Sequence, residues 1–578
     1  MSHSVVFELP PDCDPEEQPQ DAWRDMASQQ LEIPMKDIVA VELVRISFDA
    51  RARHMEWRIS AEVYMEGEEL PSPPSEEPPR YAAPADDAAH VIVIGSGPAG
   101  LFAALRLIEK GVRVTVCERG VEVQARRRDI ADLNRGEQAE PESNYAFGEG
   151  GAGTFSDGKL YTRSSKRGNV KEILEMFVAH GAPARILSAW RPHIGSNLLP
   201  KVVSAITETI RAAGSEILFN ARVDEIITAD DSENPTVKGV KLSDGRELDA
   251  QAVVLATGHS ALDALQLAQR AGATLEAKGF AMGLRVEHSQ EWLDQVQYRG
   301  MREDAGLPAS FYEVNTQIHE RGVFSFCMCP GGWIVPSQST PGTLVVNGMS
   351  LSKRDSPFAN AGIVVSIEPK DWCGKRGWRW GFNDMMKRAA EVSDHPMLHE
   401  SIEDPRGGDA INVEEGRLPV HPAIDPFFGV RLQLALEVLA SHAGGLDGKA
   451  PAQRCDLFVA GEGEVGEEMP TSYLPGVTPT DLASFLPRGI TNRLREALTE
   501  FDGHLPGFAS SNGQLLGVET RTSSPVRIMR DAESLESNSL AGLYPCGEGA
   551  GYAGGIVSAA LDGVQVANKI LAQIPVNS

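Results

Sequence analysis

A glycine-rich turn between two short apolar segments constrains the fold of this chain more than any other feature. Residues 91–94 read Val-Ile-Val-Ile, the continuous β-branched run of a strand buried in a parallel sheet. A G-x-G-x-x-G pattern and an apolar helical stretch follow, so that free N–H groups at the helix start can bind a phosphate. Glu118 ends the next strand roughly 20 residues on, where a carboxylate can bind a ribose hydroxyl. This order of elements predicts a dinucleotide-binding βαβ unit with contacts from Gly95, Gly97, Pro98, Ala99, Gly100, Glu118 and Arg119.

Two later segments indicate which dinucleotide is bound. Residues 249–258 form an apolar strand ending in Ala-Thr-Gly and resemble the second signature of glutathione-reductase-type FAD domains. Residues 542–551 and the helix after them resemble the C-terminal FAD signature of the same superfamily. The resemblance implies that Glu548 bonds the ribityl chain of FAD, although most of the superfamily has Asp there, and that the next helix start faces the flavin. It assigns cofactor contacts to Val223, Ala256, Thr257, Gly258, Gly547, Glu548, Gly554, Gly555 and Ile556.

A loop at residues 147–160 follows the first βαβ unit and holds five glycines in eleven residues. Such a loop lets the backbone lie against a planar ring or a phosphate, and Lys159 would place a cation near the flavin or a substrate anion. The alternative is a surface loop without a ligand. The basic run 126–128 is either a solvated helix face or a partner of the FAD phosphates. In the second case, Arg127 is the predicted cofactor contact. The cofactor contacts assigned to the loop are Gly150, Gly151, Gly153, Thr154, Asp157, Gly158 and Lys159.

Three strings mark a family: Phe-Cys-Met-Cys-Pro-Gly-Gly at 326–332, Gly-Val-Glu-Thr-Arg-Thr-Ser-Ser-Pro-Val-Arg at 517–527, and Gly-Glu-Gly-Ala-Gly-Tyr-Ala-Gly-Gly-Ile at 547–556. They are similar to those of bacterial FAD-dependent dehydrogenases and oxidoreductases of undefined substrate, and the likeness runs from about residue 45 to the C-terminus. The resemblance implies an α/β fold. It comprises a glutathione-reductase-type FAD-binding Rossmann domain, an inserted mixed α/β substrate domain with an antiparallel sheet, and a small N-terminal α+β module.

Composition and periodicity divide the chain into five segments. We expect an α+β module at 1–65, a Pro/Glu-rich linker at 66–89, the first part of the FAD-binding domain at 90–275, a substrate domain of many short strands at 276–529, and the C-terminal part of the FAD-binding domain at 530–578. Within the first module, a helix capped by Asp21 and a hairpin of the segments 41–48 and 55–63 are predicted.

A second G-x-G-x-x-G pattern, at residues 461–466, is predicted to be only a loop. Its glutamates would repel a pyrophosphate, and Pro470 would end the helix that such a motif requires. The chain therefore has no second predicted Rossmann unit, and any pyridine nucleotide would bind transiently or not at all.

The formal net charge of −27 disfavours binding to nucleic acid and to anionic lipid, because both carry negative charge. The first residues lack the features of a signal peptide, and no stretch reaches about 18 apolar residues. Seven scattered cysteines form no disulfide framework. We therefore expect a cytoplasmic, reduced protein that has no membrane partner.

The candidates for the chemistry lie in the predicted substrate domain and in the segment before it. Cys327 and Cys329 would share one face of a strand and form either a redox pair or buried structural thiols; a metal is not expected, because no CxxC or His cluster stands beside them. Glu519 and Arg521 would also share a face, as an arginine site for a substrate carboxylate or as a structural ion pair. The tentative catalytic residues are Arg521, Glu519, Arg527, His193 and Cys327, of which His193 has a structural alternative.

These residues predict an FAD-dependent oxidoreductase that transfers a hydride between an unidentified small organic substrate, anionic if Arg521 binds it, and flavin N5. A fumarate-reductase-like ene reductase, with an arginine as the acid, is one alternative. A tRNA-modifying flavoprotein and a flavin-binding partner protein without turnover are two others. NAD(P)H or another protein is the expected electron partner.

Overall fold

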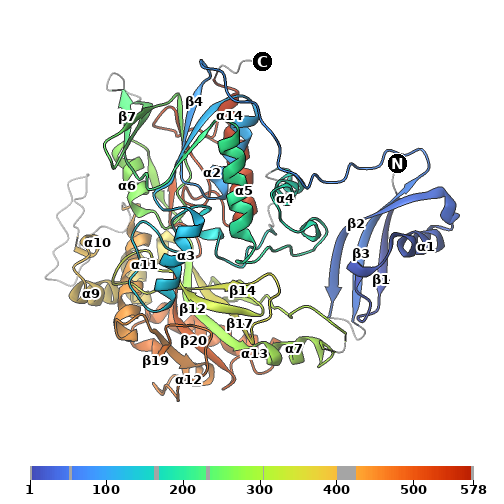
Figure 1. Ribbon diagram of the computed structural model, residues 1–578. Helices are drawn as coiled ribbons and strands as arrows, with labels where there is room; N and C mark the ends of the chain where they lie inside the picture. Colours follow the sequence, from blue (N-terminus) through green and yellow to red (C-terminus); the bar gives the residue numbers. More distant parts are fainter. Residues whose placement is uncertain are drawn as a thin grey trace.

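The computed structural model describes residues 3–50, 55–161, 168–229, 235–303, 305–399 and 425–574. The chain forms a mixed α/β protein in which a parallel sheet and a larger, mainly antiparallel sheet contribute to one hydrophobic core (Figure 1).

The parallel sheet has five strands, and segments from distant parts of the chain complete it. Its order is β22 (Leu543–Pro545), β10 (Ala252–Leu255), β4 (His90–Ile94), β5 (Arg113–Cys117) and β6 (Glu216–Leu218). Val91 and Val93 pack into one core, whereas Ile92 and Ile94 pack into another on the opposite face. Successive side chains of a strand point to opposite faces, so burial of both faces accounts for the unbroken apolar run of β4.

Helices cover the face of this sheet to which Val91 and Val93 point. They are α2 (Pro98–Glu109), α4 (Val170–Ala179), α5 (Leu199–Ala212) and α14 (Ile556–Leu571), and α2 contacts both α5 and α14 (Figure 1). The opposite side carries α6 (Leu262–Arg270) and a three-stranded sheet of β7 (Val223–Ala229), β8 (Thr236–Leu242) and β9 (Glu247–Asp249). Helix α3 (Val123–Asn134) follows β5 in the chain.

The larger sheet has seven strands in the order β13 (Asn315–Ile318), β14 (Arg321–Cys329), β17 (Phe358–Ile367), β12 (Phe280–Ser289), β20 (Gly513–Glu519), β18 (Ala450–Arg454) and β19 (Val477–Pro479). All its pairings are antiparallel except that of β18 with β19. Two short pairs accompany it: β15 (Gly332–Pro336) with β16 (Val346–Ser350), and β11 (Leu275–Ala277) with β21 (Val526–Ile528).

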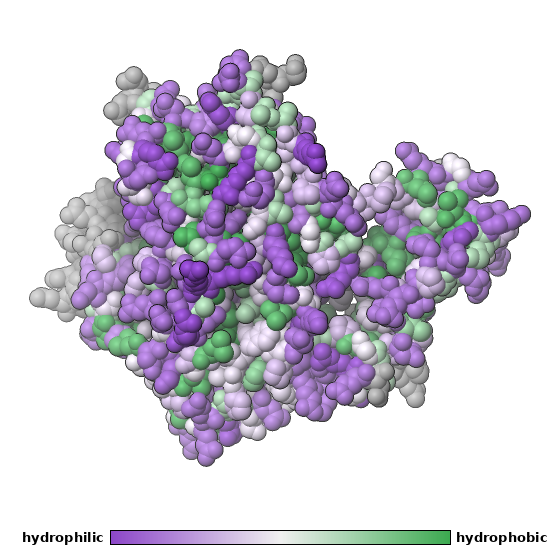
Figure 2. All heavy atoms as spheres, in the orientation of Figure 1, coloured by the Kyte–Doolittle hydropathy of each residue, from purple (hydrophilic) through white to green (hydrophobic). Residues whose placement is uncertain are grey.

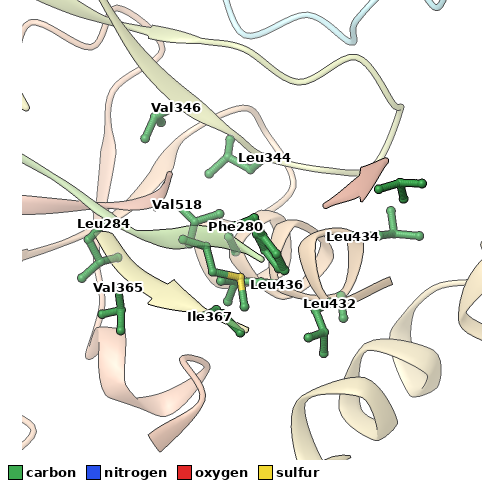
Figure 3. Close-up of a cluster of buried hydrophobic side chains, with 14 of the residues drawn as sticks. Phe280, Leu284, Leu344, Val346, Val365, Ile367, Leu432, Leu434, Leu436 and Val518 are labelled. Carbon is green, nitrogen blue, oxygen red and sulfur yellow. The ribbon is translucent and has the colours of Figure 1, made fainter. Parts of the chain in front are cut away.

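The helices of this half are α7 (Gln290–Tyr298), α8 (Gly374–Trp380), α9 (Phe382–Val392), α10 (Pro396–His399), α11 (Phe428–Gly444), α12 (Cys455–Ala460) and α13 (Arg488–His504). The strands that the sequence predicted here are confirmed, but the long helices α11 and α13 were not predicted. Helix α11 is buried on nearly all sides, and its leucines lie with Phe280 and Val518 in the core (Figure 3). Because buried polar residues such as Arg431 and Glu437 interrupt the apolar ones, α11 lacks the amphipathic periodicity by which helices are recognised. The predicted loop at residues 461–466 is confirmed; it follows α12.

The N-terminal module is a three-stranded sheet, ordered β1 (His3–Leu9), β3 (Glu56–Met65) and β2 (Ile38–Asp49), with α1 (Gln20–Leu31) packed against it. The predicted hairpin is confirmed, whereas the helix begins one residue before Asp21, which lies in the first turn. The module stands apart from the main body in Figure 1 but touches both halves. Ile46 N–H donates to Ser188 O at 2.7 Å, and the rings of Phe48 and Tyr298 lie 5.6 Å apart.

Hydrophilic residues cover most of the face shown in Figure 2, and apolar residues form small separate areas on it. Within the described ranges, none of the helices combines the length and the apolar character needed to cross a bilayer.

Candidate functional site

A cavity of about 880 Å³ lies between the two sheets. Its wall includes Ile94 and Cys117, the last residues of β4 and β5, and Ala256, which directly follows β10. Strands of the larger sheet contribute residues of β13 and β14. The cavity therefore lies at the carboxyl ends of parallel strands, where open α/β sheets bind their ligands.

Two helices begin at this cavity. Gly97 is the N-cap of α2 and Gly555 is the N-cap of α14, and neither helix start has a side-chain cap. Gly97, Pro98, Gly555 and Ile556 all line the cavity. The first N–H groups of both helices are therefore free to bind an anionic or polar ligand there.

The glycine turn leaves no room for side chains where the backbone is packed, and leaves space where it faces the cavity. A Cβ on Gly95, which has a φ of +103°, would lie 2.5 Å from the carbonyl oxygen of Ala256. A Cβ on Gly100 would lie 2.0 Å from the carbonyl oxygen of Gly95. A Cβ on Gly97 would meet only Gly151 Cα, at 4.0 Å. The turn thus presents open backbone to the cavity at Gly97, beside Gly151, as the close approach of a pyrophosphate requires.

Glu118 is buried and lines the cavity, and its carboxylate connects the two glycine turns. One oxygen accepts from the N–H and Oγ of Ser96, at 3.0 and 2.7 Å. The other accepts from the N–H groups of Gly120 and Gly148, at 2.9 and 3.0 Å. The carboxylate of Glu118, which the sequence predicted to bind a ribose hydroxyl, is thus held in a fixed position at the end of β5.

For the basic run on α3, the structure favours the solvated helix face over contact with the cofactor, except at Arg126. Arg126 is fully buried and donates to backbone carbonyls of the glycine-rich loop and the turn before it, at residues 144, 145, 148 and 149. Burial lowers the pKa of Arg126 to about 10. Arg127 is exposed and does not line the cavity, because the helix turns it away from the loop. Arg119 lines the cavity and is paired with Glu142 and Asp263.

Most of the predicted cofactor contacts come together on the cavity wall: Gly95, Gly97, Pro98, Ala99, Glu118, Arg119, Gly151, Gly153, Asp157, Gly158, Lys159, Val223, Ala256, Thr257, Gly258, Glu548, Gly554, Gly555 and Ile556. Gly100, Gly150, Thr154 and Gly547 do not line it. These four shape the turns from behind: a Cβ on Gly150 would strike Thr154 Oγ1, and one on Gly547 would lie 2.8 Å from Ala99 Cβ.

Glu548 faces a residue that the sequence reasoning missed. His259 Nδ1 lies 3.5 Å from a carboxylate oxygen of Glu548, and both side chains line the cavity. His259 directly follows the Ala-Thr-Gly string of residues 256–258, and this position was the signal for it. Other missed wall residues are Tyr161, Glu313, Phe324, Phe326 and Asn347.

Lys159 lies at the centre of a charged cluster on the cavity wall. Its Nζ is 3.2 Å from Asp157 Oδ2, 3.7 Å from Cys327 Sγ and 3.4 Å from Cys329 Sγ. Burial opposes both charges, but the pKa of Asp157 lies below its ordinary value because Lys159 and Arg354 attract its carboxylate. The pKa of Lys159 is raised in turn, because the attraction of Asp157 and the thiols outweighs burial.

Glu519 and Arg521 do not form a pair with each other, because β20 ends at Glu519 and the chain then turns. Glu519 is buried and accepts from Arg285 Nη1 at 2.6 Å. Burial raises its pKa to about 7, although Arg285 acts in the opposite direction. Arg521 lines the cavity and pairs with Glu437 of α11 at 2.8 Å.

Besides Glu519, two more of the tentative catalytic residues lie outside the cavity wall. Arg527 pairs with Glu276 at 3.0 Å and packs on the ring of Tyr552. His193 is bridged to Lys159 through the backbone, and burial, reinforced by Arg354, lowers its pKa to about 3. The structure thus brings Arg521 and Cys327 to the cavity, but not Glu519, Arg527 or His193. Among the described residues, no group of three His, Cys, Asp or Glu side chains could hold a metal ion.

Comparison with known proteins agrees with this site. Residues 279–390 and 410–522 match the family "FAD-dependent protein, C-terminal domain-like", residues 90–127 match "FAD binding domain", and residues 1–64 match a domain of unknown function. An uncharacterized protein of Clostridium beijerinckii is 37% identical over 487 residues, which cover 84% of this chain and 81% of that protein.

Solved structures resemble the chain only distantly. CtdE in complex with FAD has a TM-score of 0.27 and 12% identity over 84% of this chain and 90% of its own. FqzB has a TM-score of 0.24 and 15% identity, over 50% of this chain and 55% of its own. THI4 of Thermovibrio ammonificans has a TM-score of 0.22 and 20% identity, over 32% of this chain and 62% of its own. The match thus spans less than two thirds of THI4 and of this FqzB structure, and none of these TM-scores is high enough to support an argument.

The fold and the cavity define an FAD-binding protein of the mixed α/β class, and FAD is its cofactor. The chain belongs to the same family as the Clostridium beijerinckii protein, and its own domain matches make it a member of a bacterial family of FAD-dependent oxidoreductases.

Proposed function

We propose that the protein is an FAD-dependent dehydrogenase that transfers a hydride between a small organic substrate and flavin N5. The observation that carries this proposal is that one cavity includes both the predicted dinucleotide contacts and a wall from β13 and β14 of the other half. The flavin, when bound, supplies the hydride chemistry. The chain binds and orients the reactants.

The residues divide this work between the two ends of the cavity. The helix starts at Gly97 and Gly555 and the carboxylate of Glu118 would hold the dinucleotide. Phe324 and Phe326 of β14 add apolar surface to the opposite wall, beside the polar side chains of β13. Apolar surface with a few placed polar groups is typical of sites for small organic molecules.

The charges of the wall favour a substrate that is neutral or only weakly charged. Each Lys or Arg side chain of the described cavity wall has a carboxylate partner: Arg119 with Glu142 and Asp263, Lys159 with Asp157, Arg222 with Glu142 and Asp224, and Arg521 with Glu437. An anionic substrate would therefore meet no unpaired cation there. The same pairing of Arg521 gives no support to the ene-reductase alternative, which needs an arginine as the acid.

Anaerobic reduction followed by visible absorbance tests the proposal. We expect a panel of small neutral alcohols, amines and carbonyl compounds to contain a substrate that bleaches or restores the flavin band of the purified holoenzyme. NADH and NADPH, tested in the same way, would establish whether a pyridine nucleotide is the electron partner. A flavin that dithionite reduces, but that no organic compound reduces or reoxidises, would contradict the proposal and favour a partner protein without turnover.

A matched pair of variants assigns the reaction to this cavity. Phe324→Trp narrows the wall opposite the glycine turns and should slow reduction by the substrate at unchanged FAD content. Trp378→Phe changes an aromatic residue that is 53% exposed and outside the cavity, and it should have no effect. Equal rates for both variants would place the substrate elsewhere.

A further inference from the structure

Two cysteine thiols and one ammonium group meet on the wall of the FAD cavity. Cys327 lines the cavity and Cys329 is fully buried behind it, and both are free thiols. Lys159 Nζ lies within 3.7 Å of one sulfur and 3.4 Å of the other. Structural thiols normally pack as small apolar groups and need no cation. This contact therefore distinguishes the pair from the buried thiols elsewhere in the described chain.

The backbone is distorted at this point. Cys327 has a φ of +45°, and the register of β14 against β17 shifts between Phe326 and Cys329. The left-handed region is uncommon for residues other than glycine, and it persists where the surrounding structure holds it. Here the carbonyl of Cys327 accepts from Arg285 Nη2 at 2.7 Å and from the Cys329 thiol at 3.3 Å. The bulge thus places Arg285 beside the pair, and its Nη2 lies 3.8 Å from Cys329 Sγ.

The surroundings favour one thiolate in the pair. The pKa of Cys327 lies well below its ordinary value because of the neighbouring Cys329 thiol and because Lys159 and Arg285 attract the negative charge, although burial acts against it. Burial and the hydrogen bond with Cys327 raise the pKa of Cys329. The pair therefore holds a nucleophilic thiolate beside a thiol, which is the reactive form of a redox dithiol.

We propose that Cys327 and Cys329 form a dithiol–disulfide couple that exchanges one electron pair with the bound FAD. In the oxidative direction the Cys327 thiolate and the Cys329 thiol form an S–S bond, and the Cys329 proton is released. The two electrons, with one proton, reduce FAD; the reverse reaction cleaves the S–S bond and restores thiolate and thiol. This couple is a second redox centre beyond the proposed hydride transfer, and it requires only that FAD is bound.

Anaerobic titration of the holoenzyme with dithionite measures the couple directly. After mild oxidation, the wild-type protein should take up two electron pairs per flavin, one for FAD and one for the disulfide. Cys329→Ser should take up a single pair. Cys373→Ser should still take up two, because Cys373 is half-buried and lies outside the cavity wall.

Peptide mass spectrometry provides a readout that requires neither variant nor activity. Trypsin releases residues 322–353 as one peptide, which carries Cys327 and Cys329 and no other cysteine. From oxidised protein this peptide should be two hydrogens lighter and should resist iodoacetamide; from reduced protein it should carry two labels. Two labels in the oxidised protein, together with uptake of one electron pair, would overturn the proposal. That result would leave substrate-driven bleaching of the flavin unaffected, so the two proposals fail separately.

Discussion

Gly97→Ala should weaken FAD binding without unfolding the protein. The nearest heavy atom to the new Cβ is Gly151 Cα at 4.0 Å, an ordinary van der Waals distance, and the φ of −73° suits alanine. Alanine is a poorer N-cap than glycine by about 0.5–1 kcal/mol, and its smaller unfolded-state entropy offsets about 0.4–1 kcal/mol. We therefore expect the free energy of unfolding of the apoprotein to change by less than about 0.5 kcal/mol.

The same methyl group would stand on the cavity face of the turn at Gly97, where a pyrophosphate would approach the backbone. An extra methyl group in a closely packed site costs about 1–3 kcal/mol. For a bound dinucleotide this corresponds to an increase in Kd of about 5-fold to 150-fold. Flavin fluorescence during titration of the apoprotein with FAD measures the Kd, and urea unfolding followed by circular dichroism measures stability.

Gly100→Ala is the matched control, because the same substitution at that position should lower the stability of the fold. Its Cβ would lie 2.0 Å from the carbonyl oxygen of Gly95, whose own backbone is packed against Ala256. We expect a loss of about 3 kcal/mol or more in the free energy of unfolding. A Gly97→Ala protein with wild-type affinity for FAD would refute the assignment of the turn to the pyrophosphate. Equal destabilisation by both substitutions would refute the steric reasoning.

Three further predictions concern buried charges. Arg126→Met should lower the free energy of unfolding by about 3 kcal/mol or more, because several backbone carbonyls lose their hydrogen-bond donor. Arg127→Met, at an exposed position, should leave the urea midpoint of unfolding unchanged. Equal urea midpoints for the two variants would contradict this prediction. Arg521→Met should lower the free energy of unfolding by about 3–5 kcal/mol, because Glu437 is left buried without its cationic partner. A second substitution, Glu437→Gln, should recover part of this loss. If the effects of the two substitutions simply add in the double-mutant cycle, the ion pair does not contribute to stability. Glu519 has a pKa raised from 4.5 to about 7, so the folded protein keeps a proton that the unfolded chain releases between these values, and the free energy of unfolding should fall as pH rises through this window. In urea unfolding across this pH range, the free energy of unfolding should fall less for Glu519→Gln than for the wild type. Identical pH profiles for the two proteins would show that Glu519 does not have the raised pKa.

Features set by neighbouring residues could be predicted from the sequence. The βαβ unit from β4 to β5 depends on a local order of strand, glycines, helix and acid, and most of its predicted contacts do line the cavity. The hairpin of β2 and β3 is also local, and strict alternation of apolar residues indicated it. The glycine-rich loop of residues 147–160 was recognised by composition, although Gly150 and Thr154 support the loop from behind and do not face the ligand.

Features set by distant contacts could not be predicted. Arg126 and Arg127 are indistinguishable in a basic run, and only the packing of α3 decides which one points inward. The wall formed by β13 and β14 arises from strands whose neighbours lie far along the chain. Helix α11 brings Glu437 to Arg521, but its uniform burial removes the periodicity that would indicate a helix.

The charge pairs around the cavity show that the structural ion pair of Glu519 with Arg521, one of the two alternatives from the sequence, is not formed. Two residues apart on a strand, they would share a face, but β20 ends at Glu519. Glu519 therefore pairs with Arg285, which is 2.7 Å from the carbonyl of Cys327, and Arg521 pairs with α11 instead. As a result, Arg285 supports the bulge at Cys327, and Arg521 lines the cavity with its charge paired to Glu437. Under the proposed function, we expect such a wall to select a substrate by shape and hydrogen bonding.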